Sequence, residues 1–371
     1  MITEGTRISV RNWWAGEWRG PTVFTYHSGH LHPDPEPSLA DTATQRAARA
    51  RPATLEIPGT LFPVLFDRHV HMGLIDREAL LPGGITHALD LGWIPEEIAL
   101  WSIDSAQMGS ELPETYFVGA FLTAPGGYPG QSGWAPPGSI IELNTFEEAQ
   151  AAVDAQAELG ARAIKLMLNS DAGPLPELHA QIGVYERARR KKIPLIAHAE
   201  GVGSAQLAVD VGADLLAHAP FSETLSDGLL DEMTLMGMQW ISTIDIHGWG
   251  EQTPARAIAI DNVHRFLQRG GRVLYGTDLG NGPLPVGVNE RELLALAEAG
   301  MSANGLVTAI AGDGSNLRIG PRVAWVPGDP PSEIAFAAGE ETDTTDIAEQ
   351  TARWLAGARG TTLDYLEETL P

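Results

Sequence analysis

Residues 194–218 read PLIAHAEGVGSAQLAVDVGADLLAH and contain one short pattern twice. In each copy an apolar run of strand type ends on a histidine, His198 in the first and His218 in the second. The two histidines are 20 residues apart (218 − 198), which is about the length of one strand–helix repeat. This matched placement predicts two adjacent parallel strands that present their imidazoles at equal height. A lone histidine of this kind is more often a packed core residue, whereas the matched pair favours metal ligands.

The alternation of short apolar runs with longer helical patterns extends over most of the chain, which favours βα units around a parallel sheet. A Thr145-x-x-Glu148 capping box predicts one helix over 145–159, and a second is expected over 175–192. We expect eight strands, over residues 61–67, 84–91, 116–122, 163–168, 194–199, 214–219, 239–244 and 272–277. Eight strands can close into a barrel or form an open sheet, so the strand number alone does not decide the fold.

Further ligand-type side chains lie on three of the other expected strands or at their ends. His69 and His71 are two residues apart, so on a strand they point to the same side. Lys165 stands inside an apolar strand, where an unpaired ammonium group is very costly, so it must be paired, deprotonated or modified. A carbamate formed there with carbon dioxide would offer two oxygens to two cations. Asp278 ends the last strand, where it either caps the next helix or faces the same point.

These signals fall on the expected strands 1, 4, 5, 6 and 8, and they converge only if the sheet closes. We therefore predict an α/β fold of the (β/α)₈ TIM-barrel type, whose active site lies at the carboxyl ends of the strands. Another His-x-His pair, His30 and His32, lies in a Pro-rich stretch, 32–37, and is interpreted as part of a solvated loop.

The two ends of the chain carry additional strand-like pieces outside the expected barrel. They lie at 7–14, 22–26 and 54–57 before it and at 322–326 and 333–337 after it, followed by helical patterns over 346–358 and 363–370. We predict one small β-domain built from both ends. The expected division is 1–60 and 316–371 for the small β-domain with peripheral helices, and 61–315 for the barrel.

Composition limits the class of protein. Hydrophobic residues make up 43% of the 371 residues, which is enough for a large buried core. The net charge of -24 argues against nucleic-acid binding and indicates a solvated acidic surface. With 0 cysteines, any metal is held by His, carboxylate or modified Lys. No stretch resembles a signal peptide or a membrane span, so we expect a cytoplasmic protein that acts on a small molecule.

The order of these motifs resembles the amidohydrolase superfamily, and within it the imidazolonepropionase-like and prolidase-like branch, over roughly residues 58 to 327. Two departures from the family pattern stand out. Tyr128 follows Pro-Gly-Gly where relatives often carry His, which concerns the substrate. Residues 324–329 match the family's return strand only loosely, which concerns the small domain. The motifs that carry the resemblance are Pro58-Gly59, Asp67-Arg68-His69-Val70-His71, Gly83-Gly84-Ile85-Thr86, Asp90-Leu91-Gly92, Thr123-Ala124-Pro125-Gly126-Gly127, Ile164-Lys165, Ala197-His198-Ala199-Glu200, Ala217-His218, Gly276-Thr277-Asp278 and the stretch from Glu292-Leu293 to Met301.

The resemblance implies a binuclear metal centre of two divalent ions, with zinc favoured by the donor set. His69 and His71 would bind one metal together with Asp278, and His198 and His218 would bind the other. Carboxylated Lys165 would bridge the two metals, and a bridging hydroxide would attack the substrate while Asp278 moves its proton. A homo-oligomer is also implied by the resemblance.

The predicted function is hydrolysis of a C–N bond in an amide, a peptide or a cyclic amide. An esterase, lactonase or phosphotriesterase that uses the same metals is the enzymatic alternative, and a non-catalytic barrel that acts as an interaction protein is the alternative from another class. Candidate substrate contacts stand on loops above the metals, although each also fits simple loop packing: Tyr128, Trp134, His247, Trp249 and Asn281.

Overall fold

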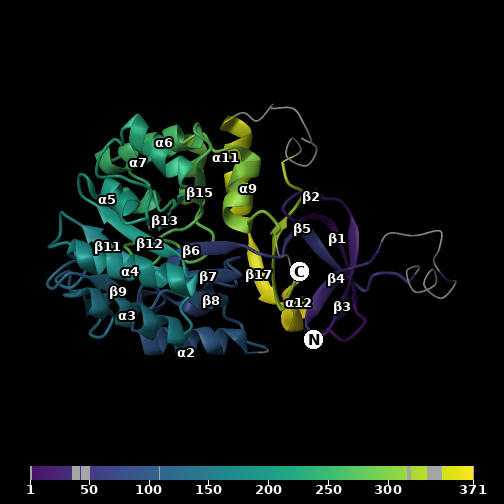
Figure 1. The fold of residues 1–371 in the computed structure, drawn as a ribbon. Coiled ribbons are helices and arrows are strands. Elements are labelled where there is room, and N and C mark those ends of the chain that lie inside the picture. The colour runs from purple at the N-terminus through teal and green to yellow at the C-terminus, as the bar shows by residue number, and fades with distance from the viewer. Residues whose placement is uncertain are drawn as a thin grey trace.

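The computed structural model describes residues 2–35, 42, 51–107, 109–315, 319–331 and 345–370. Figure 1 shows two parts side by side, a larger one with parallel strands surrounded by helices and a smaller one that consists mainly of strands. Among the described residues, no helix combines the length and the apolar character needed to cross a lipid bilayer.

The larger part contains parallel strands in two hydrogen-bonded groups. All strand pairs in both groups are parallel, as the alternation of strands and helices predicts. The first group has the order β10 (Ile140–Glu142), β9 (Phe121–Thr123), β11 (Ile164–Asn169), β12 (Leu195–Glu200), β13 (Leu215–Leu216), β14 (Gln239–Ile241) and β15 (Arg272–Leu274). The second group has the order β6 (Phe66–Val70), β7 (His87–Asp90) and β8 (Glu114–Phe117).

Backbone hydrogen bonds join the two groups of strands. Near the end of β8, the Arg162 amide donates to the Phe117 carbonyl at 2.8 Å. Beyond the end of β15, the His71 amide donates to the Leu279 carbonyl at 2.8 Å, and the Leu279 amide donates to the His69 carbonyl at 3.2 Å. The structure is therefore a mixed α/β fold in which the carboxyl end of β6 lies beside the segment that follows β15.

Helices cover the parallel strands and follow the predicted start and stop signals. The Thr145–Glu148 capping box is formed at the start of α3 (Phe146–Leu159), and Gly160 ends the helix with a φ of 101°. α4 (Leu178–Lys191) follows β11. The other helices of four or more residues are α2 (Pro95–Ala106), α5 (Ser204–Asp210), α6 (Asp227–Leu235), α7 (Pro254–Leu267), α8 (Glu290–Glu298), α9 (Ala303–Ala311), α11 (Thr345–Leu355) and α12 (Leu366–Thr369).

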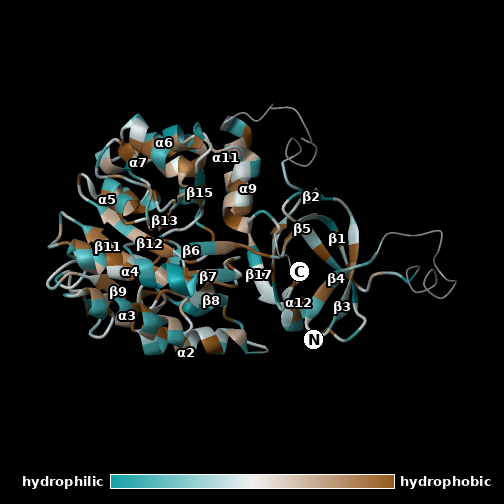
Figure 2. Cartoon of the chain, in the orientation of Figure 1, coloured by the Kyte–Doolittle hydropathy of each residue, from teal (hydrophilic) through white to brown (hydrophobic). Residues whose placement is uncertain are grey.

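The apolar core lies between the helices and the strands. Figure 2 shows helices that carry both hydrophilic and hydrophobic residues, the pattern of a helix with one packed face. Trp240 of β14 is fully buried and stacks on Phe266 of α7, with ring centroids 3.9 Å apart. Such aromatic stacking adds about 1 kcal/mol beyond the burial of apolar area.

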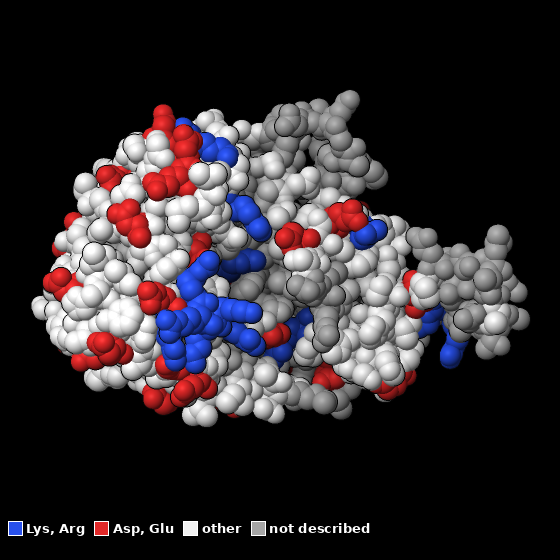
Figure 3. Space-filling model, in the orientation of Figure 1, with Lys and Arg blue, Asp and Glu red and all other residues white. Residues whose placement is uncertain are grey.

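The surface agrees with the acidic composition. Figure 3 shows Asp and Glu side chains scattered over one face, while many of the visible Lys and Arg side chains gather near its middle. Basic residues of α4 are partly neutralised, since Arg187 and Lys191 pair with Asp154 at 2.5 and 3.0 Å. The basic end of this helix is therefore a solvated, ion-paired surface.

The smaller part is a seven-stranded sheet that draws on both ends of the chain. Its core contains Ile8, Phe24 and Trp325, all buried. The predicted strand at 333–337 lies outside the described residues. The order is β17 (Arg359–Thr362), β16 (Arg322–Pro327), β5 (Leu55–Phe62), β1 (Arg7–Trp14), β3 (Thr22–His27) and β4 (His30–Pro33), with β2 (Trp18–Arg19) paired to β1.

The interpretation of His30 and His32 as loop residues is wrong, because both lie on strand β4. Ser28 and Gly29 have φ values of 51° and 81°, so they form a tight turn that returns the chain alongside β3. Pro33 is tolerated because β4 is the edge strand of the sheet. Gly29 is the residue type that favours this conformation, whereas Ser28 is a non-glycine residue at positive φ.

Several predicted strands are shorter in the structure. The expected strand 239–244 ends at Ile241, since Thr243 adopts a φ of 46° that no strand continues. The expected strand 214–219 is reduced to Leu215–Leu216. The apolar run at 61–67 belongs to two strands, with β5 in the small sheet ending at Phe62 and β6 beginning at Phe66.

Candidate metal centre and pocket

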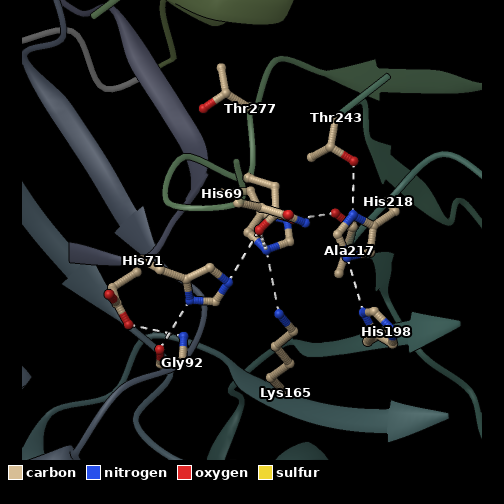
Figure 4. Close-up of polar contacts among 12 residues, drawn as sticks. His69, His71, Gly92, Lys165, His198, Ala217, His218, Thr243 and Thr277 are labelled. Carbon is tan, nitrogen blue, oxygen red and sulfur yellow. Dashed lines mark hydrogen bonds and ion pairs between the residues drawn. The ribbon is translucent and has the colours of Figure 1, made fainter. Parts of the chain in front are cut away.

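The six side chains predicted as metal ligands gather at one place; five lie in the carboxyl-terminal half of a parallel strand or just beyond it, whereas Lys165 is the second residue of β11. Figure 4 shows five of them close together. His69 lies between His71 and His218, Lys165 points towards His69, and His198 lies beside His218. A cavity of about 530 Å³ opens over them, a size that suits a small-molecule site. His69 is fully buried beneath the cavity, and the five others line it: His71, Lys165, His198, His218 and Asp278.

The first cluster consists of His69, His71 and Asp278. One oxygen of Asp278, Oδ1, lies 3.0 Å from His69 Nε2 and 3.2 Å from His71 Nε2. The ligand atoms of the three residues all lie within 4.8 Å of one another, which is close enough to share one cation. The three side chains therefore fit a metal ion, because two imidazoles and a carboxylate are a common donor set for zinc.

The first two histidines are held in the tautomer that a metal requires. Nδ1 of His69 donates to the Ala217 carbonyl at 2.8 Å, and Nδ1 of His71 donates to the Gly92 carbonyl at 3.1 Å. Because a carbonyl oxygen only accepts, each ring carries a proton on Nδ1, so Nε2 is the atom that faces Asp278 and would bind a metal. Such backbone acceptors fix ring orientation at metal sites.

The second cluster consists of His198 and His218. His198 Nδ1 lies 3.0 Å from His218 Nε2, and His218 Nδ1 lies 2.8 Å from the Thr243 hydroxyl. On the other side of the ring, His198 Nε2 lies 3.1 Å from the Glu200 carboxylate. Since this carboxylate accepts the Nε2 proton, His198 presents the lone pair of Nδ1 beside His218, and the pair fits a second cation.

Lys165 lies between the two clusters on β11. It is 2% exposed, and its Nζ atom lies 3.4 Å from His69 Nε2 and 5.3 Å from the Phe121 ring centroid. Within the described residues, no carboxylate lies within ion-pair distance of Nζ. Burial lowers the pKa of Lys165 to about 8, although Asp278 and Asp90 act in the opposite direction. More of this amine is therefore neutral at pH 7 than in an exposed lysine.

Burial also sets the charge of the other groups. It lowers the pKa of His69 to about 4 and the pKa of His218 well below its usual range, so both imidazoles are neutral and able to bind a metal. Burial raises the pKa of Asp278, but its histidine neighbours outweigh burial and hold that pKa well below its usual range. The site thus combines neutral imidazoles with an ionised carboxylate.

No family model matches this sequence, and no curated protein matches it. Solved structures do match. Ochratoxinase from A. niger has a TM-score of 0.69 and 18% identity over 94% of this chain and 92% of that chain. A Xaa-Pro dipeptidase with bound methionine has a TM-score of 0.66 and 17% identity over 92% of this chain and 96% of that chain. A structure described as an amidohydrolase has a TM-score of 0.64 and 17% identity over 94% of this chain and 96% of that chain.

The chain has the amidohydrolase fold. The resemblance noted in the sequence is therefore confirmed for the fold, over nearly the whole length of both chains. In this fold three of the six predicted ligands lie on the strands β6, β11 and β12, and the other three lie in the segments that follow β6, β13 and β15.

All five side chains that were predicted to contact the substrate line the cavity. Tyr128 stacks on His198 with ring centroids 5.1 Å apart, and Trp134 lies 5.4 Å from the His71 ring. Trp249 donates from its indole nitrogen to the Asn281 carbonyl at 3.2 Å, which ties two loops together. His247 packs on Phe221 with ring centroids 3.9 Å apart. Their roles toward a substrate stay predictions.

The cavity is also lined by residues that were not predicted as site residues, among them Asn169, Glu200 and Phe221. Asn169 donates to Glu200 at 2.7 Å, and Glu200 in turn contacts His198. Burial raises the pKa of Glu200, but its contacts with His198, His247 and Asn169 outweigh burial and lower it. The sequence carried one signal, since Glu200 stands two residues after His198 and therefore on the same side of β12.

The loop that carries His247 and Trp249 is held in place by hydrogen bonds from α8. Buried Glu292 of α8 accepts the backbone amides of Ile244 and Asp245 at 3.0 and 2.7 Å. Arg291 adds hydrogen bonds to the Asp245 carboxylate at 2.9 and 3.0 Å. The helix thereby fixes the loop that forms one wall of the cavity.

Glu200→Ala is expected to weaken metal binding about 10- to 100-fold, the usual effect of removing the partner of a ligating histidine. Without the carboxylate, the proton of His198 is free to move from Nε2 to Nδ1, which blocks the lone pair that faces His218. Competition with a chromogenic chelator measures the affinity. Glu200→Gln keeps an acceptor oxygen and should therefore retain part of the metal affinity. Glu232→Ala, at an exposed position on α6, is the matched control. Equal affinities in all variants contradict the orienting role.

Proposed function

We propose that this protein is a metal-dependent hydrolase that cleaves the C–N bond of an amide, a peptide or a cyclic amide. The observation that supports it most is the convergence of four histidines, one lysine and one aspartate below a single cavity. Structures that share its fold include a Xaa-Pro dipeptidase, a molinate hydrolase and a bottromycin amidohydrolase.

The fold part of the proposal is a closed barrel. Hydrogen bonds from Arg162 to Phe117 and from His71 to Leu279 support one continuous (β/α)₈ barrel over 61–315. The segments 1–60 and 316–371 would then supply the small β-domain and the peripheral helices. In such a barrel the carboxyl ends of all strands face one cavity, which is where the six candidate ligands lie.

The two clusters define which residues would hold two divalent metal ions. His69, His71 and Asp278 would hold one, and His198 and His218 would hold the other. Neutral Nζ of Lys165 would form an N–C bond to carbon dioxide with release of one proton, and the carbamate oxygens would face both clusters. Two bound cations, with zinc favoured, would lower the pKa of a shared water and polarise a substrate carbonyl.

The chain's own groups then have distinct roles. The Asp278 carboxylate would accept a proton from the attacking water and deliver it to the leaving nitrogen. Burial raises the pKa of Tyr128, which therefore keeps its proton and can donate a hydrogen bond to the substrate. Trp134 and Trp249 would pack against apolar parts of the substrate, and His247 would orient a carbonyl group.

We expect elemental analysis of the freshly purified protein to find about two divalent ions per chain, as for a two-metal hydrolytic site. Removal of the metal with a chelator should abolish hydrolysis of a panel of amides and dipeptides, and added zinc with bicarbonate should restore it. Turnover of lactones, esters or phosphotriesters alone would overturn the amide assignment. Absence of bound metal after zinc and bicarbonate addition would overturn the proposal and favour a non-catalytic protein.

A further inference from the structure

Three histidines share one face of the β3–β4 hairpin, outside the candidate pocket. In the antiparallel register His27 lies opposite His30, and Thr25 lies opposite His32. Because side chains alternate along a strand, His27, His30 and His32 all point away from the core of the small sheet. Leu31 points the other way and is 3% exposed. Figure 1 shows the hairpin at the outer edge of the small part, far from β11 and β12.

Two of these imidazoles carry a proton on Nδ1, which is the tautomer that binds a metal through Nε2. Nδ1 of His27 lies 2.8 Å from the Glu4 carboxylate, and Nδ1 of His30 lies 3.0 Å from the Ser28 carbonyl. Both acceptors place the proton on Nδ1 and leave the Nε2 lone pair free. The arrangement repeats that of His69 and His71 in the pocket, where backbone carbonyls accept from Nδ1.

The three rings are neighbours, although their ligand atoms do not all lie within 4.8 Å of one another, so one ion would gather them only after side-chain rotation. The ring centroid of His32 lies 6.2 Å from that of His27 and 6.5 Å from that of His30. The side chain of His27 is 71% exposed, so small rotations about its side-chain bonds meet no packing resistance. The hairpin itself is held by four consecutive residue pairs, which keep the three Cβ atoms on one rigid surface.

We propose that His27, His30 and His32 form a binding site for a borderline divalent transition metal ion, Zn²⁺, Ni²⁺ or Cu²⁺, with Glu4 orienting His27. Imidazole nitrogen is a preferred ligand of these ions, and three imidazoles would leave a fourth position for water. The site is independent of the hydrolytic activity proposed above, because none of its residues lines the cavity.

The test uses the untagged full chain with its pocket loaded with zinc. Calorimetric titration with zinc chloride should find one additional binding event per chain in the wild type and in His179→Gln. His179 is an exposed histidine on α4 and serves as the matched control. The additional event should disappear in His32→Gln, and Glu4→Gln should weaken it about tenfold, the effect of removing an orienting partner.

A second measurement is retention on immobilised Ni²⁺. Wild type and His179→Gln should elute at higher imidazole than His32→Gln, while circular dichroism shows equal folding. The proposal is overturned when His32→Gln binds as much additional zinc as the wild type, or when His179→Gln loses binding to the same extent as His32→Gln. Metal in the pocket, counted separately by elemental analysis, should be equal in all four proteins.

Discussion

Asp278→Asn is expected to lower kcat/KM for amide hydrolysis about 10²- to 10⁴-fold, the range that one acid–base group contributes. The carboxylate Oδ1 lies 3.0 and 3.2 Å from Nε2 of His69 and His71, and Asn281 donates to Oδ2 at 2.9 Å. An amide in this place keeps the shape of the side chain but cannot accept a proton from the attacking water. The loss should fall mainly on kcat, because the group acts in the chemical step.

Asparagine is the appropriate replacement, since Asp278 has a φ of 56° and asparagine tolerates the left-handed region better than most residues. The variant should therefore fold like the wild type. Metal content must be measured in parallel, so that a loss of activity at equal metal content is separable from a loss of metal. Exposed Asp231→Asn on α6 is the matched control. Full activity of the metal-loaded Asn variant contradicts the proton-transfer role.

The placement of the candidate ligands was predictable because it depends on two simple periods. Residues two apart on a strand share a side, which joins His69 to His71. A repeat of 20 residues (218 − 198) places His198 and His218 on neighbouring strands, and the structure finds their nitrogens 3.0 Å apart. Neither argument needs side-chain packing, so sequence alone was sufficient.

The orientation of the ligands was not predictable from sequence. Nδ1 of His69 is held by the carbonyl of Ala217, which lies 148 residues away along the chain. Nδ1 of His71 is held by the carbonyl of Gly92, which lies 21 residues away, beyond the end of the neighbouring strand β7. Such hydrogen bonds depend on which strands become neighbours and on how far each strand extends, and no local pattern records either.

The hairpin of the small sheet shows a different reason for failure. Proline residues near His32 favoured a loop, and the turn at Ser28 has a positive φ without a glycine at that position. Pairing with β3 outweighs these local preferences: Pro33 lies opposite Phe24, and on an edge strand its missing N–H costs no hydrogen bond to a further strand. Tertiary context thus decided the structure where local residue preference was weak.

Lys165→Met is expected to reduce the metal content from about two ions to about one and to lower kcat/KM about 10³-fold, the effect of losing several kcal/mol of charge stabilisation from one cation. Lys165 is 2% exposed on β11, so the nearly isosteric methionine fills the same space. The change therefore removes the amine and its capacity to form a carbamate, and it leaves the packing around Phe121 in place.

Lys165→Ala adds a positive test of the carbamate, because it leaves a cavity where the side chain was. A short carboxylic acid such as propionate can occupy this cavity with its two oxygens toward the histidine clusters, and it should restore part of the activity and of the metal content. The same acid should not restore Lys165→Met, whose side chain fills the space. Exposed Lys191→Ala on α4 controls for the loss of a lysine. Undiminished hydrolysis by Lys165→Met contradicts the carbamate, since no other described group lies between the two clusters with oxygens to offer both.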